Sequence, residues 1–375
     1  MKIVLVVSSM ETGGAERVAA VLSSAWAARS DSVTLVVTYS KRGSCFYPIS
    51  EKVNLIFLAD RMRRDAHIPL GFAAKLAELR RIFVEAQPDV IVSFLTNVNI
   101  AAILASRGLN IPVVVCEHND PAADGRSLLW RLLCRLVYPQ ASALTFLSES
   151  IATAFCKGRE GVIPYVAVVP NPLPEELLGV AKPRRGSGRK RLISVGRLHP
   201  QKQYGLLIDA FAKVADEFDD WDLWIWGEGA ERSMLTERIA ELHLASRVYL
   251  PGKTQAPWDE MVAADAFVLS SRFEGMPMAL MESMALGVPA VAFDCRSGPR
   301  ELMRDGRDGL LIPPGDAGEL AAALRRLLSD RALREELGSK GARSIRERYS
   351  VVTILAVWDQ LFAQLRIVDD STGAR

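Results

Sequence analysis

The sequence predicts an α/β protein of two domains, each with a parallel sheet at its centre. Short apolar runs rich in Val, Ile and Leu alternate with longer amphipathic stretches, and this alternation occurs twice, with a proline-rich break at 170–174 between the two series. The length of 375 residues suits two domains. The composition, 49% hydrophobic and 24% charged, is typical of globular proteins and excludes extended disorder or a coiled coil.

The first series extends from the N-terminus to residue 172. Its apolar runs show little alternation, as expected for strands that are buried on both faces. Amphipathic stretches at 15–29, 70–86, 97–107 and 127–139 lie between them, and this order implies right-handed crossovers between parallel strands. The candidate strands are 2–8, 32–38, 53–57, 89–93, 111–116, 142–146 and 166–169.

The break between the two series predicts an inter-domain linker. Pro170, Pro172 and Pro174 can continue neither a helix nor a central strand, and the stretch 182–190 is basic and contains glycine. We therefore expect a linker over 173–190, between a first domain at 1–172 and a second domain at 191–350.

The second series repeats the strand–helix pattern. Open parallel sheets bind ligands at the carboxyl ends of their strands, so two such sheets facing one another would form a deep cleft with the linker as its hinge. The candidate strands are 191–195, 222–226, 247–250, 266–269, 289–293 and 309–312. The candidate helices are 203–218, 230–243, 277–286, 298–304 and 317–328, followed by 331–348 and 351–366.

Charge and cysteine content narrow the function classes. The net charge of +2 is too balanced for a protein that holds nucleic acid by bulk charge, although the mildly basic first domain leaves both chance and an anionic partner or membrane surface open. The five cysteines include no C-x-x-C pair, which argues against a disulfide framework or zinc site and favours a reducing cytoplasm. The first apolar run is too short for a signal peptide, and no run approaches the ~20 residues of a membrane span.

The densest group of candidate site residues lies at 270–289. A candidate strand runs into a loop with Gly275 and Pro277, and Pro277 suits the first position of a helix. The free N–H groups and the positive end of that helix would attract a phosphate. Glu274 and Glu282 would repel a phosphate, so we interpret both as acceptors for sugar or ribose hydroxyls. The alternative is that Glu282 caps or pairs structurally and Glu274 is solvated.

A second group follows the first candidate strand of the second domain. Gly196 lets the backbone turn, and Arg197 and Lys202 emerge where the strand ends and the next helix begins. Two cations at this place can neutralise a diphosphate, Arg through a planar fork and Lys as a point charge. The alternative is a pair of surface cations on a loop.

Two glycine loops are weaker candidates. Gly13 and Gly14 lie between the first candidate strand and helix, where glycine permits a close approach of the backbone to a ligand, although a tight turn also explains them. The segment 226–232 begins like a dinucleotide fingerprint, but Arg232 occupies its third glycine position. We therefore reject NAD binding and keep a phosphate-lining loop as an option.

His118 follows the candidate strand 111–116, at an end that would face the predicted cleft. A lone histidine is more often structural, so a functional and a structural role both stay open. The other histidines are scattered, at positions 67, 199 and 243, and the sequence predicts no metal site.

Together these motifs resemble glycosyltransferase family 4, whose members are retaining enzymes with the GT-B fold. The most specific match is Glu274-x7-Glu282 with its Gly-Met-Pro loop, and the likeness covers nearly the whole chain. It implies two facing Rossmann-like domains with an interdomain cleft, the acceptor in the first domain and a nucleotide-sugar donor in the second. It also implies that the last helix, at about 351–366, returns to the first domain. The other matching segments are 13–17, 169–172, 196–202 and 298–301.

The resemblance also implies a mechanism without metal or cofactor, in which a UDP- or GDP-linked sugar is a substrate. Arg197 and Lys202 would hold the donor diphosphate, and a phosphate oxygen would take the proton of an acceptor hydroxyl that attacks from the front face. Glu274 would contact hydroxyls of the donor sugar, and Glu282 would bind the ribose. The remaining assignments are His118 against the transferred sugar, Gly13 and Gly14 near the diphosphate, backbone contacts from Gly196, Gly275, Met276 and Pro277, and Lys253 near the base.

Helix 127–139 is the candidate for a membrane contact. It combines several Leu and one Trp with Arg126, Arg131 and Arg135, a pattern typical of helices that lie in a bilayer interface. The basic stretch 61–64 could add a contact, and the alternative is a core helix whose arginines point outward. Since related enzymes often extend lipid-diphosphate-linked sugars at the inner face of the cell membrane, the resemblance implies peripheral attachment there.

Two other function classes stay open from the sequence. A sugar-nucleotide epimerase or a phosphorylase can share the two facing domains, although the paired glutamates argue against the epimerase. A non-catalytic subunit that binds nucleotide or lipid would have little need for Arg197, Lys202, Glu274 and Glu282 together. The expected function is therefore sugar transfer to a saccharide, with a lipid-diphosphate-linked glycan of surface polysaccharide synthesis as the acceptor.

Overall fold

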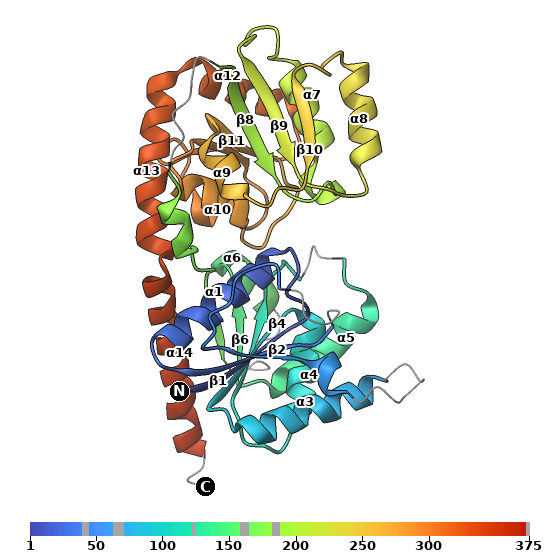
Figure 1. Ribbon diagram of the computed structural model, residues 1–375, viewed down its shortest axis with the longest axis vertical. Coiled ribbons are helices and arrows are strands. Elements are labelled where there is room, and N and C mark those ends of the chain that lie inside the picture. The colour runs from blue at the N-terminus through green and yellow to red at the C-terminus, as the bar shows by residue number, and fades with distance from the viewer. Residues whose placement is uncertain (40–44, 63–70, 122–124, 158–164, 182–187, 373–375) are drawn as a thin grey trace. The chain divides into compact units, whose positions relative to one another are not determined.

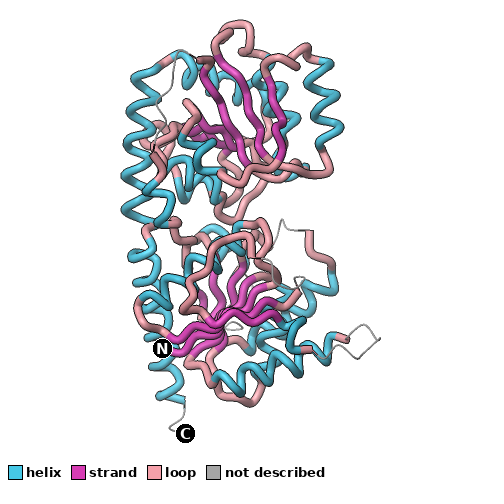
Figure 2. The backbone as a smooth tube through the Cα atoms, in the orientation of Figure 1, coloured by secondary structure: helices cyan, strands magenta, loops and turns pink. Residues whose placement is uncertain are grey.

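The computed structural model describes residues 1–39, 45–62, 71–121, 125–157, 165–181 and 188–372, with side chains up to residue 365. The chain divides into two compact units. Unit 1 comprises Met1–Pro172 and Val351–Arg375, and unit 2 comprises Leu173–Ser350. Each unit contains one sheet with helices packed against it (Figures 1 and 2).

The described part of unit 1 forms a seven-stranded sheet in the order β3-β2-β1-β4-β5-β6-β7, and every strand pair is parallel. The order reverses between β1 and β4, which makes this the switch point where open α/β sheets bind ligands. All the strands predicted for the first domain are present, with bounds that differ by one or two residues. They are β1 (Lys2–Val7), β2 (Ser32–Val37), β3 (Asn54–Phe57), β4 (Val90–Phe94), β5 (Val113–Glu117), β6 (Ala143–Phe146) and β7 (Val166–Val168).

The helices of unit 1 include two short ones that the sequence did not predict, α2 and α6. Helix α6 begins at an N-cap, because Ser148 Oγ accepts a hydrogen bond from the Ile151 N–H at 3.3 Å. The helices are α1 (Gly14–Ala28), α2 (Leu58–Arg61), α3 (Phe72–Ala86), α4 (Thr96–Ser106), α5 (Leu128–Val137), α6 (Glu149–Cys156) and α14 (Val351–Thr372).

Helix α14 packs against α1 within unit 1 (Figure 1). The Trp358 indole meets Trp26 edge to face with ring centroids 5.5 Å apart, and Asp359 accepts two hydrogen bonds from Arg29 at 2.7 and 2.8 Å. The apolar residues of α14 recur at helical spacing, which gives one buried stripe. They are Val351, Ile354, Trp358, Leu361, Phe362 and Leu365.

The described part of unit 2 forms a six-stranded parallel sheet in the order β10-β9-β8-β11-β12-β13. Its switch point lies between β8 and β11. The six strands match the predicted ones and are β8 (Lys190–Val195), β9 (Trp221–Trp226), β10 (Val248–Gly252), β11 (Ala266–Leu269), β12 (Ala290–Phe293) and β13 (Leu310–Ile312).

The helices of unit 2 follow the predicted order, except that one additional helix is present and one helix is shorter than predicted. The six-residue α9 was not predicted, and α7 ends at Ala212 rather than near 218. Asp330 caps α13 by accepting a hydrogen bond from the Leu333 N–H at 2.9 Å, which separates α13 from α12. The helices are α7 (Tyr204–Ala212), α8 (Arg232–Glu241), α9 (Pro257–Val262), α10 (Met278–Ala285), α11 (Pro299–Leu302), α12 (Ala317–Ser329) and α13 (Arg331–Tyr349).

The predicted linker differs from the structure at its start. Residues Glu175–Gly179 form a 3-10 helix, and Leu173 and Leu177 are buried. The Leu173 N–H donates a hydrogen bond to the Tyr349 carbonyl at 2.7 Å, so this stretch packs within unit 2. Apolar side chains at helical spacing explain why it does not behave as a spacer. Residues 182–187 of the predicted linker lie outside the described residues.

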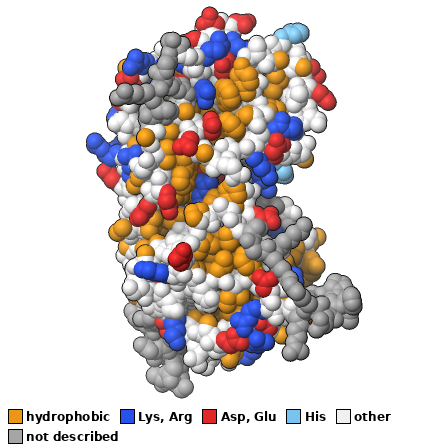
Figure 3. Space-filling model, viewed as in Figure 1, with side chains coloured by type: hydrophobic (Ala, Val, Ile, Leu, Met, Phe, Trp, Pro, Cys, Tyr) orange, Lys and Arg blue, Asp and Glu red, His pale blue; other side chains and the backbone are white. Residues whose placement is uncertain are grey.

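Positive and negative side chains are intermingled over the face of the molecule that Figure 3 shows. This distribution agrees with the nearly balanced charge of the chain. Among the described helices, none combines the length and the apolar content that crossing a membrane requires.

Candidate functional site

Lys202 and Glu274 meet at the carboxyl end of the unit 2 sheet. The Nζ of Lys202 lies 2.6 Å from Oε1 of Glu274, and only 15% and 9% of the two side chains are exposed. Strands β8 and β11 are neighbours, so the loops that follow them lie side by side at the switch point. The structure thus brings together two residues that the sequence assigned to the donor.

Hydrogen bonds hold the loops of Lys202 and Glu274 together. Ser270 Oγ donates to the Lys202 carbonyl at 2.7 Å, and Gln201 Nε2 donates to the Phe273 carbonyl at 2.9 Å. These contacts fix the backbone on both sides of the Lys202–Glu274 pair. Sequence reasoning missed the roles of Ser270 and Gln201, because their partners lie about seventy positions away along the chain.

The 274–277 loop is packed against Gly298, the first residue of another family-like segment. Gly298 has φ of +96°, and a Cβ there would lie 2.8 Å from Pro277 Cδ and 3.0 Å from the Gly275 carbonyl oxygen. Glycine is therefore required both by the backbone conformation and by the close approach. Met276 and Pro277 are buried, and Pro277 is the residue before α10 rather than its first helical residue.

Glu282 lies inside α10 and is 1% exposed. Glutamate is almost never fully buried without a partner, so this burial fits both the ribose assignment and the structural alternative. Its assignment to the ribose stays a prediction.

Glycines at the end of β9 have a packing role that the sequence did not reveal. A Cβ on Gly227 would lie 1.8 Å from the Gly196 carbonyl oxygen, and a Cβ on Gly229 would lie 2.2 Å from the Leu198 carbonyl oxygen. The Leu198 N–H also donates to the Glu228 carbonyl at 3.0 Å. The glycines of the 226–232 segment therefore let two loops approach each other backbone to backbone. The option that this segment also lines a phosphate site stays a prediction.

The other predicted cations of unit 2 are open to solvent. Arg197 follows Gly196 at the end of β8, and Lys253 follows β10; both side chains are exposed. Neither lies in the Lys202–Glu274 contact. Their predicted contacts with the diphosphate and the base stay predictions.

In unit 1, Gly13 and Gly14 lie where β1 leads into α1, as predicted. A Cβ on Gly13 would lie 2.1 Å from Glu16 Oε2, so glycine here makes room for the Glu16 carboxylate. That carboxylate accepts a hydrogen bond from Ser9 Oγ at 2.8 Å, and the Gly13 N–H donates to Tyr47 Oη at 3.3 Å. In this structure the side chains that approach Gly13 closely are those of the protein itself, Glu16 and Tyr47.

His118 follows β5 directly and packs against Phe94, with ring centroids 4.2 Å apart. Its Nε2 is buried and has no hydrogen-bond partner among the described residues. Burial lowers the pKa of the imidazole from 6.5 to about 4, so the ring is neutral at neutral pH. A buried polar atom without a partner can accept or donate a hydrogen bond to a ligand, which supports the functional interpretation of His118.

A buried carboxylate that the sequence did not single out precedes His118. Glu117, 2% exposed, pairs with Arg126 through contacts of 3.1 and 2.9 Å, and only 7% of the Arg126 side chain is exposed. Tyr138 Oη donates to Glu117 Oε1, and Thr96 Oγ1 lies 3.3 Å from both carboxylate oxygens. We call these four residues the Glu117 cluster.

Helix α5 exposes large apolar side chains. Leu128 is 80% exposed, Arg131 and Arg135 are also exposed, and the helix contains no acidic residue. Cys134 and Val137 form its buried side and belong to the core of unit 1, so α5 packs through one side and leaves the other exposed. The exposed apolar residues are Leu128, Leu129, Trp130, Leu132 and Leu136.

Two basic residues predicted for the membrane contact are engaged by carboxylates of unit 1. Arg126 does not belong to the exposed surface, because its guanidinium is used within the Glu117 cluster. Arg61 pairs with Glu78 and Glu85, at 3.1 and 2.5 Å. Arg63 and Arg64 lie outside the described residues.

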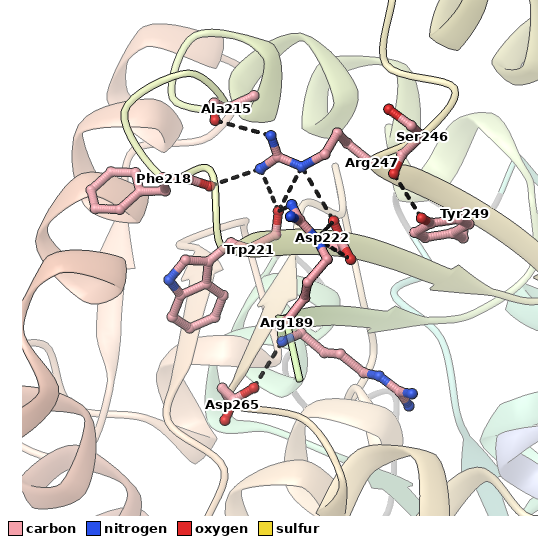
Figure 4. A network of polar contacts seen from close by, with 10 residues as sticks. Arg189, Ala215, Phe218, Trp221, Asp222, Ser246, Arg247, Tyr249 and Asp265 are labelled. Atoms are coloured by element: carbon pink, nitrogen blue, oxygen red, sulfur yellow. Dashed lines mark hydrogen bonds and ion pairs between the residues drawn. The ribbon is translucent and has the colours of Figure 1, made fainter. Parts of the chain in front are cut away.

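The chain contains an Asp-x-Asp triplet, Asp220-Trp221-Asp222, which sequence reasoning missed. Lys190 Nζ lies 2.6 Å from Asp220. Arg189 and Arg247 contact Asp222 at 2.8 and 3.2 Å, as Figure 4 shows. Both carboxylates are therefore engaged by cations, at the amino end of the sheet. The described residues contain no group of three or more His, Cys, Asp or Glu side chains that could hold a metal ion.

Comparison with known families assigns both units. Residues 13–172 match the model described as "Glycosyl transferase 4-like domain", and residues 180–344 match "Glycosyl transferases group 1". The chain belongs to glycosyltransferase family 4. Gly13, Gly14 and His118 lie in the first matched segment of this family 4 protein, and the donor candidates of unit 2 lie in the second.

Similar proteins extend this family assignment. A relative from Campylobacter jejuni, named GalNAc-alpha-(1->4)-GalNAc-alpha-(1->3)-diNAcBac-PP-undecaprenol alpha-1,4-N-acetyl-D-galactosaminyltransferase, is 26% identical over 98% of this chain and 99% of its own length. The exopolysaccharide phosphotransferase of Streptomyces coelicolor is 29% identical over 95% of this chain, which spans 40% of that protein. The crystal structure of Anabaena HepE in complex with UDP-glucose, 22% identical, superposes with a TM-score of 0.77 over 97% of this chain and 100% of HepE, which shows the shared GT-B fold.

Proposed function

We propose that this family 4 protein is a retaining hexosyltransferase that needs no metal ion. It moves a sugar from a UDP- or GDP-linked donor to a saccharide acceptor, and the acceptor is a lipid-diphosphate-linked glycan of surface polysaccharide synthesis. The single observation that carries this proposal is the Lys202–Glu274 pair at the carboxyl end of the unit 2 sheet.

Lys202 supplies positive charge where the leaving nucleoside diphosphate accumulates negative charge. An ammonium group carries three donors, and in the described structure one is engaged by Glu274 at 2.6 Å, so the group can also contact phosphate oxygens. Exposed Arg197 on the loop before it adds a second cation. Preorganised charge of this kind typically contributes about 10²–10³ in rate.

Glu274 accepts hydrogen bonds from hydroxyls of the donor sugar. Ionised carboxylates are acceptors only, and a second oxygen, Oε2, remains beside the one that contacts Lys202. Contact with Lys202 also offsets the repulsion that this carboxylate would exert on a nearby phosphate. The acceptor hydroxyl passes its proton to a phosphate oxygen, so the reaction requires no separate protein base.

His118 contacts the transferred sugar through a neutral ring. Its buried Nε2 has no partner in the described part of the chain, and its pKa of about 4 keeps the ring uncharged at neutral pH. A neutral imidazole can hydrogen-bond a hydroxyl without adding positive charge beside the diphosphate.

The acceptor assignment follows the names of the relatives. The Campylobacter relative, which this chain matches over nearly its full length, is named as acting on an undecaprenol-diphosphate-linked glycan. The relatives named as transferases do not favour the epimerase or phosphorylase alternative.

Exposed α5 attaches the protein to the membrane face where such an acceptor resides. Its apolar side chains and two exposed arginines suit insertion between the headgroups of anionic lipids. This attachment is peripheral.

The decisive experiment is a donor panel. UDP-, GDP- and ADP-sugars are screened by thermal shift, and the donors that stabilise the protein are then tested for transfer onto a membrane lipid extract in the presence of EDTA. We expect transfer from one donor, undiminished by EDTA, with the anomeric configuration of the donor kept in the product. Donor turnover to an epimer or a sugar phosphate without acceptor would instead assign one of the alternatives.

Membrane attachment is tested by sedimentation with phosphatidylglycerol vesicles. We expect salt-sensitive binding that the double variant Leu132→Glu/Leu136→Glu removes. Met234→Glu is the matched control, because Met234 is 49% exposed on α8 of unit 2. Equal sedimentation of the α5 variant and the native protein would contradict this part of the proposal.

A further inference from the structure

The Glu117 cluster places a buried ion pair directly before His118. Burying a carboxylate and a guanidinium costs several kcal/mol per ion, and well-packed apolar residues often stabilise a protein equally well. Stability alone is therefore a weak reason for this pair. The pair lies at the carboxyl end of β5, directly before His118, and this position indicates a role in orienting that residue.

Separate segments of unit 1 converge on the end of β5 through this cluster. Arg126 precedes α5, Tyr138 follows α5, and Thr96 is the first residue of α4. All three contact the same carboxylate of Glu117. Asn99 Nδ2, also on α4, donates to the Cys116 carbonyl at 3.1 Å. The two residues before His118 are thus held by α4 and by both ends of α5.

The ring that packs on His118 is also fixed by its surroundings. Phe94 is followed by Leu95, which has φ of +74° although it is not glycine. Such a conformation costs about 1–3 kcal/mol and persists only where neighbouring contacts impose it. The Leu95 N–H donates to the Cys116 carbonyl at 3.2 Å, so the strained residue is attached to the same end of β5.

We propose that Glu117 is a positioning residue for His118. By binding Arg126, Tyr138 and Thr96, the carboxylate sets the direction in which the chain leaves β5 and thereby the place of the imidazole against Phe94. The proposal rests on the proposed function, because that function gives His118 its contact with the transferred sugar.

The test compares Glu117→Gln with Asp222→Asn in the full-length protein. Each substitution neutralises a buried carboxylate held by arginine, but Asp222 lies at the amino end of the unit 2 sheet. We expect Glu117→Gln to lower kcat by roughly 10²-fold, because small misplacements of a reacting group have effects of this size. Thermal stabilisation by the nucleoside diphosphate should be unchanged, and Asp222→Asn should keep kcat within about twofold of the native value.

A second readout does not depend on activity. The chain has four histidines, so the His118 ring protons can be followed by NMR of histidine-labelled protein. We expect Glu117→Gln to move these resonances, since the imidazole leaves the face of Phe94, and Asp222→Asn to leave them in place. Tyr138→Phe, which removes one donor to Glu117, serves as the milder variant if Glu117→Gln does not fold, and should move the same resonances.

Unshifted His118 resonances in a folded Glu117→Gln or Tyr138→Phe variant would overturn the proposal. An equal shift in Asp222→Asn would do so as well, because the effect would then be general destabilisation. A native protein that transfers no sugar would contradict the proposed function instead, and the NMR comparison would still decide whether Glu117 positions His118.

Discussion

The two ends of the unit 2 sheet carry ion pairs of different character. At the amino end, Arg247 contacts Asp222 and also donates to the main-chain carbonyls of Ala215, Phe218 and Trp221 (Figure 4). Arg189 contacts both carboxylate oxygens of Asp222, at 2.8 and 2.9 Å. The polar groups of this network are directed at the protein itself.

At the carboxyl end the polar groups are less completely engaged. Lys202 reaches Glu274 through one 2.6 Å contact, and the hydroxyl of Ser271, 1% exposed, has no hydrogen-bond partner among the described residues. A buried hydroxyl without a partner is rare and is available to a ligand. The amino end also holds one unpartnered buried atom, Trp221 Nε1, so the two ends differ in their ion pairs rather than in this respect. The two ion pairs thus differ in what else their partners contact, and we expect the pair at the carboxyl end to be the one that serves a ligand.

The largest expected effect is on catalysis at the carboxyl end. Lys202→Ala removes the charge that receives the leaving diphosphate, and we expect transfer to fall by about 10²–10³. Glu274→Ala should lose transfer as well, while both variants keep their cooperative unfolding. The measurement is kcat with the donor identified by the panel, and native activity in either variant would contradict the site.

At the amino end, Arg247→Met should have the opposite profile. It leaves Asp222 with one fewer cation and removes one donor from each of three main-chain carbonyls, so we expect the free energy of unfolding to fall by about 3 kcal/mol. The value of kcat measured below the melting temperature should stay near native. A large loss of kcat in the folded variant would contradict the expectation that the amino end serves stability and the carboxyl end catalysis.

The pH dependence of stability extends the comparison to the carboxyl end of the unit 1 sheet. The pKa of His118 is about 4 in the folded protein, and the pKa of a solvated imidazole in the unfolded chain is about 6.5. The unfolded chain therefore takes up a proton first as the pH falls, and stability is lost between pH 6.5 and 4 by at most about 3 kcal/mol. Denaturant unfolding of the native protein and of His118→Gln should diverge over this range, whereas parallel curves would contradict the buried, neutral ring.

The smallest expected effect concerns Gln201. Gln201→Ala removes the hydrogen bond to the Phe273 carbonyl, which is worth about 1 kcal/mol. We expect up to about a tenfold loss of kcat/KM for the donor, because the Lys202 loop is less well held beside Glu274. Thr236→Ala, which removes an exposed hydrogen bond on α8, is the control and should be neutral.

The fold could be predicted because buried parallel strands appear in the sequence as short apolar runs. Each predicted strand is present, since Val, Ile and Leu runs such as Lys2–Val7 have few alternatives to a central strand. The segments that were missed are short. Helices α2 and α9 have four and six residues, which is too few for a helical repeat to emerge from the sequence.

Local motifs were enough to name candidate site residues, but they did not reveal most of the contacts between segments. Glu274 and Glu282 share one loop–helix segment, whereas the contacts of Glu117 with Arg126 and Tyr138 depend on how α5 returns to β5. The packing role of the 227–229 glycines was missed for the same reason, because their partners belong to another loop. Sequence spacing carries no information on such contacts until the strand order is known.

Unit 2 is one uninterrupted stretch, Leu173–Ser350, inserted into unit 1, which is completed only by α14. Two crossovers, one at each boundary, would therefore be enough to graft the corresponding stretch of another family member into this chain. An excised fragment ending at Pro172 would instead leave the Trp26 indole without Trp358, and would be prone to aggregate. With the donor in unit 2 and the acceptor in unit 1, as we propose, chimaeras built on these two junctions should exchange the sugar that is delivered while keeping the molecule that receives it.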